Sequence, residues 1–162
     1  MTKRPRLHLS LLALIAMTLS TYFVFTPSAS ASPDLNRVII LTNEHRRAAG
    51  CGDLVWNAAL ATAAQGHAND MAANDYFSHT GRDGSKFTAR IRNAGYKYRL
   101  AAENIAGGQE SPEEVVAGWM SSAGHRANIL NCRLQHIGIG YGYNPNSAYV
   151  SYWVQDFGAQ RK

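Results

Sequence analysis

A run of alternating glycines near the C-terminus constrains the fold more than any other feature of this chain. From residue 137 to residue 143 every second position is glycine, and isoleucine or tyrosine occupies the positions between them. Alternation with a period of two is typical of a β-strand. One face of this strand is bare backbone, so we expect a helix or another strand to approach it closely.

A second strand pattern follows the glycine run, and helical patterns precede both. Residues 149–157 alternate again, and the turn sequence Asn-Pro-Asn-Ser at 144–147 separates the two runs, which predicts a β-hairpin. Apolar residues recur with helical spacing in four upstream segments, at 35–49, 57–74, 86–94 and 111–122. Helices followed by a hairpin predict an α+β domain in which helices cover a small antiparallel sheet.

Local signals add detail to this outline. Ser111-Pro112-Glu113-Glu114 combines an N-cap, a proline at the first helical position and a capping-box glutamate. Gly66, inside the alanine-rich second helix, predicts tight packing against a neighbour. Residues 96–108 have no clean period and are expected to form a loop. Gly124 is expected to turn the chain after the fourth helix and so to place His125 away from a regular helix face.

The first 31 residues have the pattern of a secretory signal peptide. Three basic residues precede an apolar stretch at 9–25, and Ala29-Ser30-Ala31 is a small-residue cleavage signature. A membrane anchor is the alternative, but serines and threonines interrupt the stretch and no stop-transfer flank follows. Cleavage would leave 162 − 31 = 131 residues without a second hydrophobic span. We therefore expect one domain, 32–162, that is secreted to an extracellular or periplasmic location.

The charge of the mature chain argues against a nucleic-acid partner. The formal net charge is +5, and loss of the three basic residues of the signal leaves 5 − 3 = +2. Residues 86–99 carry five basic side chains beside two tyrosines and no acid. This stretch either meets an anionic polymer or forms a solvated face, and we favour the solvated face.

Export would place Cys51 and Cys132 in an oxidising compartment, where a disulfide is the default. The bond would close a long loop and contribute on the order of 4 kcal/mol in the chain-entropy model. Two separate buried thiols are the alternative.

His79, Glu103 and His125 are the candidate chemical groups, because each lies at a loop or element end, where functional side chains concentrate. Two imidazoles and one carboxylate suit zinc or another divalent cation with an open position for water. Taken singly, each histidine also fits a structural role, and Glu103 could accept backbone hydrogen bonds. The chain has no H-E-x-x-H pair and no G-x-S-x-G elbow, which counts against a zinc-protease helix and against serine catalysis.

Six motifs follow one another along the mature chain: Asn43-Glu44-His45-Arg46, Phe77-Ser78-His79, Glu103-Asn104-Ile105-Ala106, Trp119-Met120, the heptapeptide 124–130, and Tyr152-Trp153-Val154-Gln155-Asp156-Phe157-Gly158. In this order they resemble the CAP superfamily, which includes cysteine-rich secretory proteins, antigen 5 and pathogenesis-related proteins of class one, and specifically its bacterial secreted branch. The resemblance implies a three-layer α-β-α sandwich with a small, mainly antiparallel central sheet. It also implies a cleft with two histidines and two acids, which in some members holds zinc or another divalent ion.

The resemblance assigns residues to this cleft. His79 and His125 match the two histidines and would hold the metal, and Glu103 matches the first acid, as a ligand or a neighbour of the ligands. Asn104 completes the expected cleft set, together with Ser122, which stands where many relatives have the second acid. A missing carboxylate should weaken a cation site. Two other acids are candidate substitutes, Glu114 and Asp83.

Family membership implies no single activity, since members include sterol or lipid binders, envelope and defence proteins and isolated proteases. The sequence favours a monomeric, non-enzymatic binding module for an extracellular ligand, which would be a lipid, a sterol or an envelope polymer. The alternative is a metal-assisted hydrolase of peptide, ester or cell-wall substrates with Glu103 as base. A purely structural role for the cleft is the third reading.

Overall fold

The computed structural model describes Met1 and residues 32–160. The expected signal peptide, apart from Met1, lies outside the described residues. No helix in the described part of the chain is long and apolar enough to cross a bilayer. The described residues form helices and strands with the bounds α1 (Leu35–Ala48), β1 (Val55–Trp56), α2 (Ala58–Asn74), α3 (Phe87–Asn93), β2 (Tyr98–Gly107), α4 (Pro112–Ser121), α5 (Ala123–Ile129), β3 (His136–Tyr143) and β4 (Ser151–Gln160).

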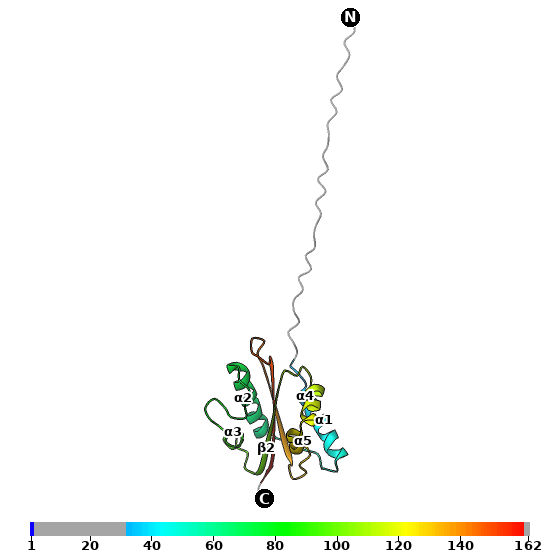
Figure 1. The fold of residues 1–162 in the computed structure, drawn as a ribbon, viewed down its shortest axis with the longest axis vertical. Coiled ribbons are helices and arrows are strands. Elements are labelled where there is room, and N and C mark those ends of the chain that lie inside the picture. The colour runs from blue at the N-terminus through cyan, green and yellow to red at the C-terminus, as the bar shows by residue number, and fades with distance from the viewer. Residues whose placement is uncertain (2–31, 161–162) are drawn as a thin grey trace. The chain divides into compact units, whose positions relative to one another are not determined.

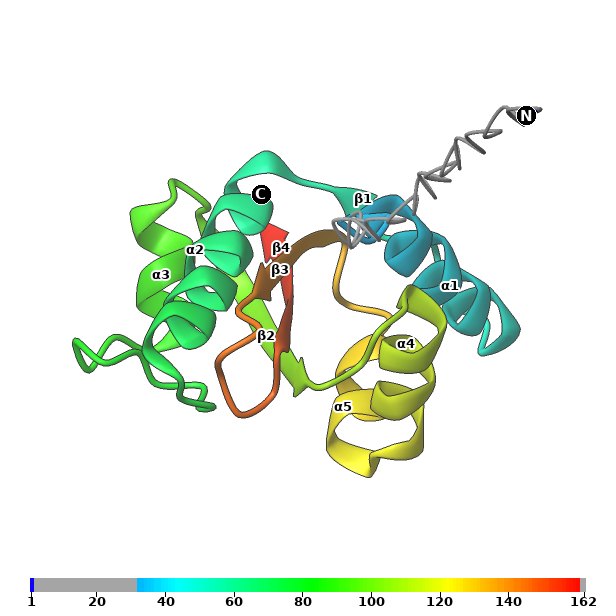
Figure 2. The same ribbon diagram turned by 90° about the horizontal axis from the view of Figure 1, so that it is seen from above.

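The strands form one sheet in the order β1-β3-β4-β2. β3 and β2 both pair antiparallel with β4, and only the short β1 pairs parallel, with β3. Helices α2 and α3 cover one face of the sheet, and α1, α4 and α5 cover the other (Figures 1 and 2). The expected α-β-α sandwich with a mainly antiparallel sheet is confirmed.

The glycine face of β3 lies against α2. A Cβ atom on Gly138 would come within 2.1 Å of the backbone nitrogen of Ala61, and one on Gly140 within 2.3 Å of the carbonyl carbon of Ala64. Both sides of the contact lack large side chains, so the helix rests directly on the strand. The close approach expected from the glycine run is confirmed, and the element that approaches is α2.

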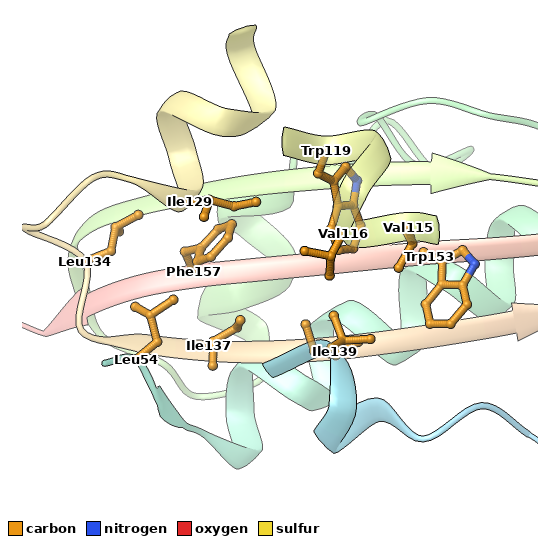
Figure 3. Packing of buried hydrophobic residues seen from close by; sticks show 11 residues of the cluster. Leu54, Val115, Val116, Trp119, Ile129, Leu134, Ile137, Ile139, Trp153 and Phe157 are labelled. Atoms are coloured by element: carbon orange, nitrogen blue, oxygen red, sulfur yellow. The ribbon is translucent and has the colours of Figure 1, made fainter. Parts of the chain in front are cut away.

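The main hydrophobic core lies between the sheet and the layer of α1, α4 and α5. Trp119 of α4 packs there with Phe157 and Trp153 of β4, and all three side chains are almost fully buried (Figure 3). A second cluster fills the space between α2 and the sheet, where small alanines of the helix meet Tyr152 and Val154. β4 therefore contributes side chains to both cores.

Arg46 and the disulfide hold α1 against the chain that follows α5. The buried guanidinium of Arg46 donates to the carbonyls of Ile129 at 2.7 Å, Asn131 at 3.0 Å and Leu134 at 3.1 Å. Close by, Cys51 and Cys132 form the expected disulfide. These contacts anchor the C-terminal end of α5.

Two elements differ from the sequence-based expectations. The stretch 96–108, expected to be a loop, contains β2, which pairs with β4 along its length. Its middle residues Glu103, Asn104 and Ile105 are all buried, so no alternation of polar and apolar residues marks the strand. The expected turn at Gly124 is also wrong, because residues 123–129 form α5 after a single extended residue, Ser122.

The prediction for Gly66 is wrong as well. This glycine is exposed, and a Cβ atom built on it would have no neighbour within 4 Å. The close contacts of α2 come from its alanines instead, which face β3 on the opposite side of the helix.

Candidate functional site

A cleft of about 590 Å³ opens beside β2, which forms one edge of the sheet. This volume lies in the range of small-ligand sites. The two helical layers flank β2 at this edge (Figure 2). The cleft is lined by Phe77, Ser78, His79, Ile105, Ala106, Gly107, Gln109, Gly118, Trp119, Ser122, His125 and Tyr149.

Glu103 lies behind the cleft, with both carboxylate oxygens engaged. His79 Nδ1 lies 2.7 Å from Oε1, and Arg90 Nη2 donates to Oε2 at 2.6 Å. A carboxylate paired with a guanidinium acts as an acceptor, so Nδ1 of His79 carries the proton and Nε2 is the nitrogen left for the cleft. The Glu103 side chain is 1% exposed, whereas that of His79 is 52% exposed.

Arg90 also fixes the loop that carries His79. Its guanidinium donates to the carbonyl oxygens of His79 at 3.1 Å and Ser85 at 3.0 Å. Sequence reasoning placed Arg90 only in a basic stretch. Its role depends on α3 packing beside β2, which the local pattern does not encode.

The second acid beside Glu103 is Asp156 of β4. The register places Asp156 directly opposite Glu103, so the two side chains share one face of the sheet. Asp156 is fully buried, and neither of its oxygens has a hydrogen-bond partner among the described residues. Burial, and then the charge of Glu103, raise the pKa of Asp156 well above its ordinary value. The protonated form of Asp156 is therefore favoured over a wider pH range than that of an ordinary aspartate.

Neither expected substitute acid lines the cleft. Glu114 lies in the first turn of α4, where its carboxylate accepts from the backbone of Glu110, and Asp83 accepts from the backbone of Ser85. The signal for Asp156 in the sequence is that it is the one charged residue of the strand β4.

His125 projects into the cleft from α5. Burial, and then the nearby charge of His79, lower the pKa of His125. The ring is consequently neutral at neutral pH. Ser122 also lines the cleft, as the residue that precedes α5, and its side chain makes no capping hydrogen bond.

Asn104 does not line the cleft, although it was expected there. Neighbouring residues of a strand point to opposite faces, so Asn104 points away from the side of Glu103. It is fully buried, donates to the carbonyl of His125 at 3.2 Å and accepts from Asn128 Nδ2 at 2.8 Å. Asn104 thereby attaches α5 to β2 and positions His125.

The donor set does not fit a closed zinc site. Among the described residues, no group of three or more histidine, cysteine, aspartate or glutamate side chains is placed to hold a metal ion. Glu103 is occupied by His79 and by the cation of Arg90. Only the imidazoles of His79 and His125 remain as donors facing the cleft.

The fold and the cleft define a class of small α-β-α sandwich domains with two histidines at the edge of the sheet. Residues 39–157 match the profile of the CAP family, the cysteine-rich secretory protein family. This chain belongs to that family, as the motif resemblance implied.

Two curated relatives come from Bacillus subtilis. The uncharacterized protein YkwD is 40% identical over 130 residues, which are 80% of this chain and 48% of YkwD. The uncharacterized membrane protein YlbC is 35% identical over 104 residues, 64% of this chain and 30% of YlbC. The chain thus spans less than half the length of either relative.

Similar folds occur in solved structures. An extracellular SCP-domain protein of Bacillus anthracis has a TM-score of 0.70 and 30% identity, over 77% of this chain and 40% of that one. An outer surface protein of Borrelia burgdorferi has a TM-score of 0.70 and 23% identity, over 78% of this chain and 95% of that one, and shows the fold alone.

Proposed function

We propose that this protein is exported and acts as a non-enzymatic binding module whose cleft holds an extracellular ligand. The observation that carries the proposal is the state of Glu103, which is buried and paired with both His79 and Arg90. A carboxylate held in this way stabilises the cleft wall and is not free to take a proton from water. The groups left to face a ligand are hydrogen-bonding and apolar side chains.

Export is supported by three observations of different kinds. The first 31 residues have the pattern of a signal peptide. The two cysteines form a disulfide, which persists in oxidising compartments. One structural relative is an extracellular protein by its name.

The hydrolase alternative needs a base that the cleft does not supply freely. Glu103 would have to release His79 or Arg90 before accepting a proton. Among the described residues, no serine hydroxyl is hydrogen-bonded to a histidine ring, so an activated serine is not set up either.

The test separates binding from turnover. The purified exported protein and its His125→Ala variant are incubated with cell-envelope polysaccharide, lipid extract and a panel of peptide, ester and peptidoglycan substrates, with and without divalent cations. We expect retention on one envelope component that His125→Ala weakens, and no turnover. Metal-dependent turnover that His125→Ala abolishes would establish the hydrolase instead.

A further inference from the structure

Two aromatic side chains form a platform at the mouth of the cleft. Phe77 and Tyr149 both line the cleft, yet they are 40% and 43% exposed. Their ring centroids lie 5.1 Å apart with the planes tilted by 42°. Large aromatic surface left in water at the rim of a cleft marks a binding surface.

The backbone holds Tyr149 in this place. A Cβ atom on Gly107 would come within 2.9 Å of Cγ of Tyr149, so the ring rests on glycine backbone. The next residue, Val150, has a φ of 64° and is the centre of a γ-turn closed by a 2.6 Å hydrogen bond from Ser151 N to Tyr149 O. A β-branched residue with positive φ is strained. Such strain persists where the surrounding structure enforces it, and it is concentrated at ligand sites.

The rest of the cleft lining offers hydrogen-bonding groups and contains no lysine, arginine, aspartate or glutamate. His79 presents Nε2, and His125 is an uncharged ring that donates or accepts. Gln109 lines the cleft, and its side-chain oxygen is buried without a hydrogen-bond partner among the described residues. The fixed charges nearby belong to Glu103 and Arg90. Arg90 Nη2 lies 2.6 Å from Glu103 Oε2, so the two charges neutralise each other behind the cleft wall.

This combination selects one ligand chemistry. A pyranose ring has a face of C–H groups, which stacks on the negative face of an aromatic ring, and hydroxyls around its rim, which pair with imidazole and amide groups. A fatty chain would leave those polar groups without partners, at a cost in free energy. An anionic polymer would find no unpaired fixed cation in the lining. We infer that the cleft binds a neutral saccharide unit of an envelope polymer on the platform of Phe77 and Tyr149.

This inference rests on the proposed binding function and names its ligand class. The test uses the exported protein and an uncharged tetramer of N-acetylglucosamine in isothermal titration calorimetry. We expect binding that Tyr149→Ala and Phe77→Ala each weaken at least about tenfold. Tyr143→Ala is the matched control, because Tyr143 is an exposed tyrosine of the same hairpin, 53% exposed, that does not line the cleft. Its binding should be unchanged.

The possible outcomes test the saccharide inference separately from the proposed binding function. Saccharide binding that survives both aromatic substitutions would overturn the platform. Binding of fatty-acid micelles or an anionic polymer in place of the tetramer, dependent on His125, would overturn the saccharide inference and leave the binding function standing. Absence of His125-dependent binding to all three probes would overturn both. Unfolding curves identify any variant that is misfolded. If one of the two aromatic variants is misfolded, saccharide binding by the other one tests the platform.

Discussion

At the scale of single residues, the chemistry of the cleft depends on the hydrogen-bond partners of the Glu103 carboxylate. Glu103 accepts from His79 on one oxygen and from Arg90 on the other, at the bottom of a wall that solvent barely reaches. Arg90 thus occupies the position in which a bound cation would neutralise the same carboxylate. On the neighbouring strand, burial and then the charge of Glu103 raise the pKa of Asp156.

Removing Arg90 should make the cleft a better cation site. Arg90→Gln frees one oxygen of Glu103 and removes a positive charge, so we expect zinc affinity to rise about tenfold, or about 1.4 kcal/mol. The measurement is zinc titration against a chromophoric chelator. Further substitution of His79→Ala or His125→Ala should abolish the gain.

Arg92→Gln is the control for this prediction. Arg92 belongs to the same helix but bonds to Tyr98, not to Glu103. Its zinc affinity should equal that of the parent protein. An unchanged affinity in Arg90→Gln as well would show that Glu103 does not take part in cation binding.

Asp156 should make the protein less stable as the pH rises. Its pKa is raised in the folded state, so above about pH 4 the unfolded chain releases a proton that the folded chain keeps. The folded state loses relative stability from there until the pH passes the raised pKa. Asp156→Asn removes the titrating group, so the loss of unfolding free energy between pH 4 and pH 7 should be smaller in the variant than in the parent.

The measurement is denaturant unfolding at both pH values. Asp34→Asn is the control, because Asp34 is an exposed N-cap and asparagine caps helices equally well. An Asp156→Asn variant that loses as much stability between pH 4 and pH 7 as the parent would contradict the raised pKa of Asp156.

At the scale of elements, two close contacts place the histidines. α2 rests on the glycine face of β3, and the loop that follows α2 carries His79 to the cleft. On the opposite face, Asn104 and Asn128 tie α5 to β2 and present His125. A single extended residue, Ser122, separates α4 from α5 and sets the direction of the second helix.

Glycine substitutions test the contact between α2 and β3. Gly140→Ala places a Cβ atom 2.3 Å from backbone of Ala64, so either the helix must shift or the fold loses stability, by about 3 kcal/mol or more. Gly66→Ala, inside α2 with open space around it, should instead stabilise the protein by about 0.8 kcal/mol. Chemical denaturation measures both. Equal effects of the two substitutions would refute the close contact.

At the scale of the whole molecule, long-range links join the C-terminal end of α1 to the segment that follows α5. The Cys51–Cys132 disulfide joins residues 81 apart in sequence, and Arg46 bridges the same region through three backbone carbonyls. These links lie at the C-terminal end of α5. The contacts that stabilise the whole domain therefore also hold the helix that carries His125.

Removal of the disulfide should destabilise the domain without changing its fold. The double variant Cys51→Ser/Cys132→Ser should lose about 4 kcal/mol, because the unfolded chain gains the freedom of a long open loop. Thermal unfolding followed by circular dichroism measures the loss. Reducing agent should produce the same loss in the parent protein and none in the double variant, and a loss of less than about 1 kcal/mol would contradict the expectation.

The sequence by itself determined those features that one local segment encodes. The glycine alternation specified a strand with one bare face, and the cap at Ser111 located a helix start. The two cysteines and the ordered motifs predicted the disulfide and the family. In each case the residues that indicate the feature in the sequence are the same residues that form it in the structure.

Only the tertiary structure decided what surrounds each candidate group. β2 has no visible period because its middle is buried on both faces, and that burial exists only once both helical layers are in place. The pairing of Glu103 with Arg90, and the position of Asp156 opposite it, depend on strand register and on α3. Asn104 stays out of the cleft lining because its buried side chain bonds to Gln155, to Asn128 and to the carbonyl of His125. Charge pairing and burial are properties of distances in space, and sequence separation does not determine those distances.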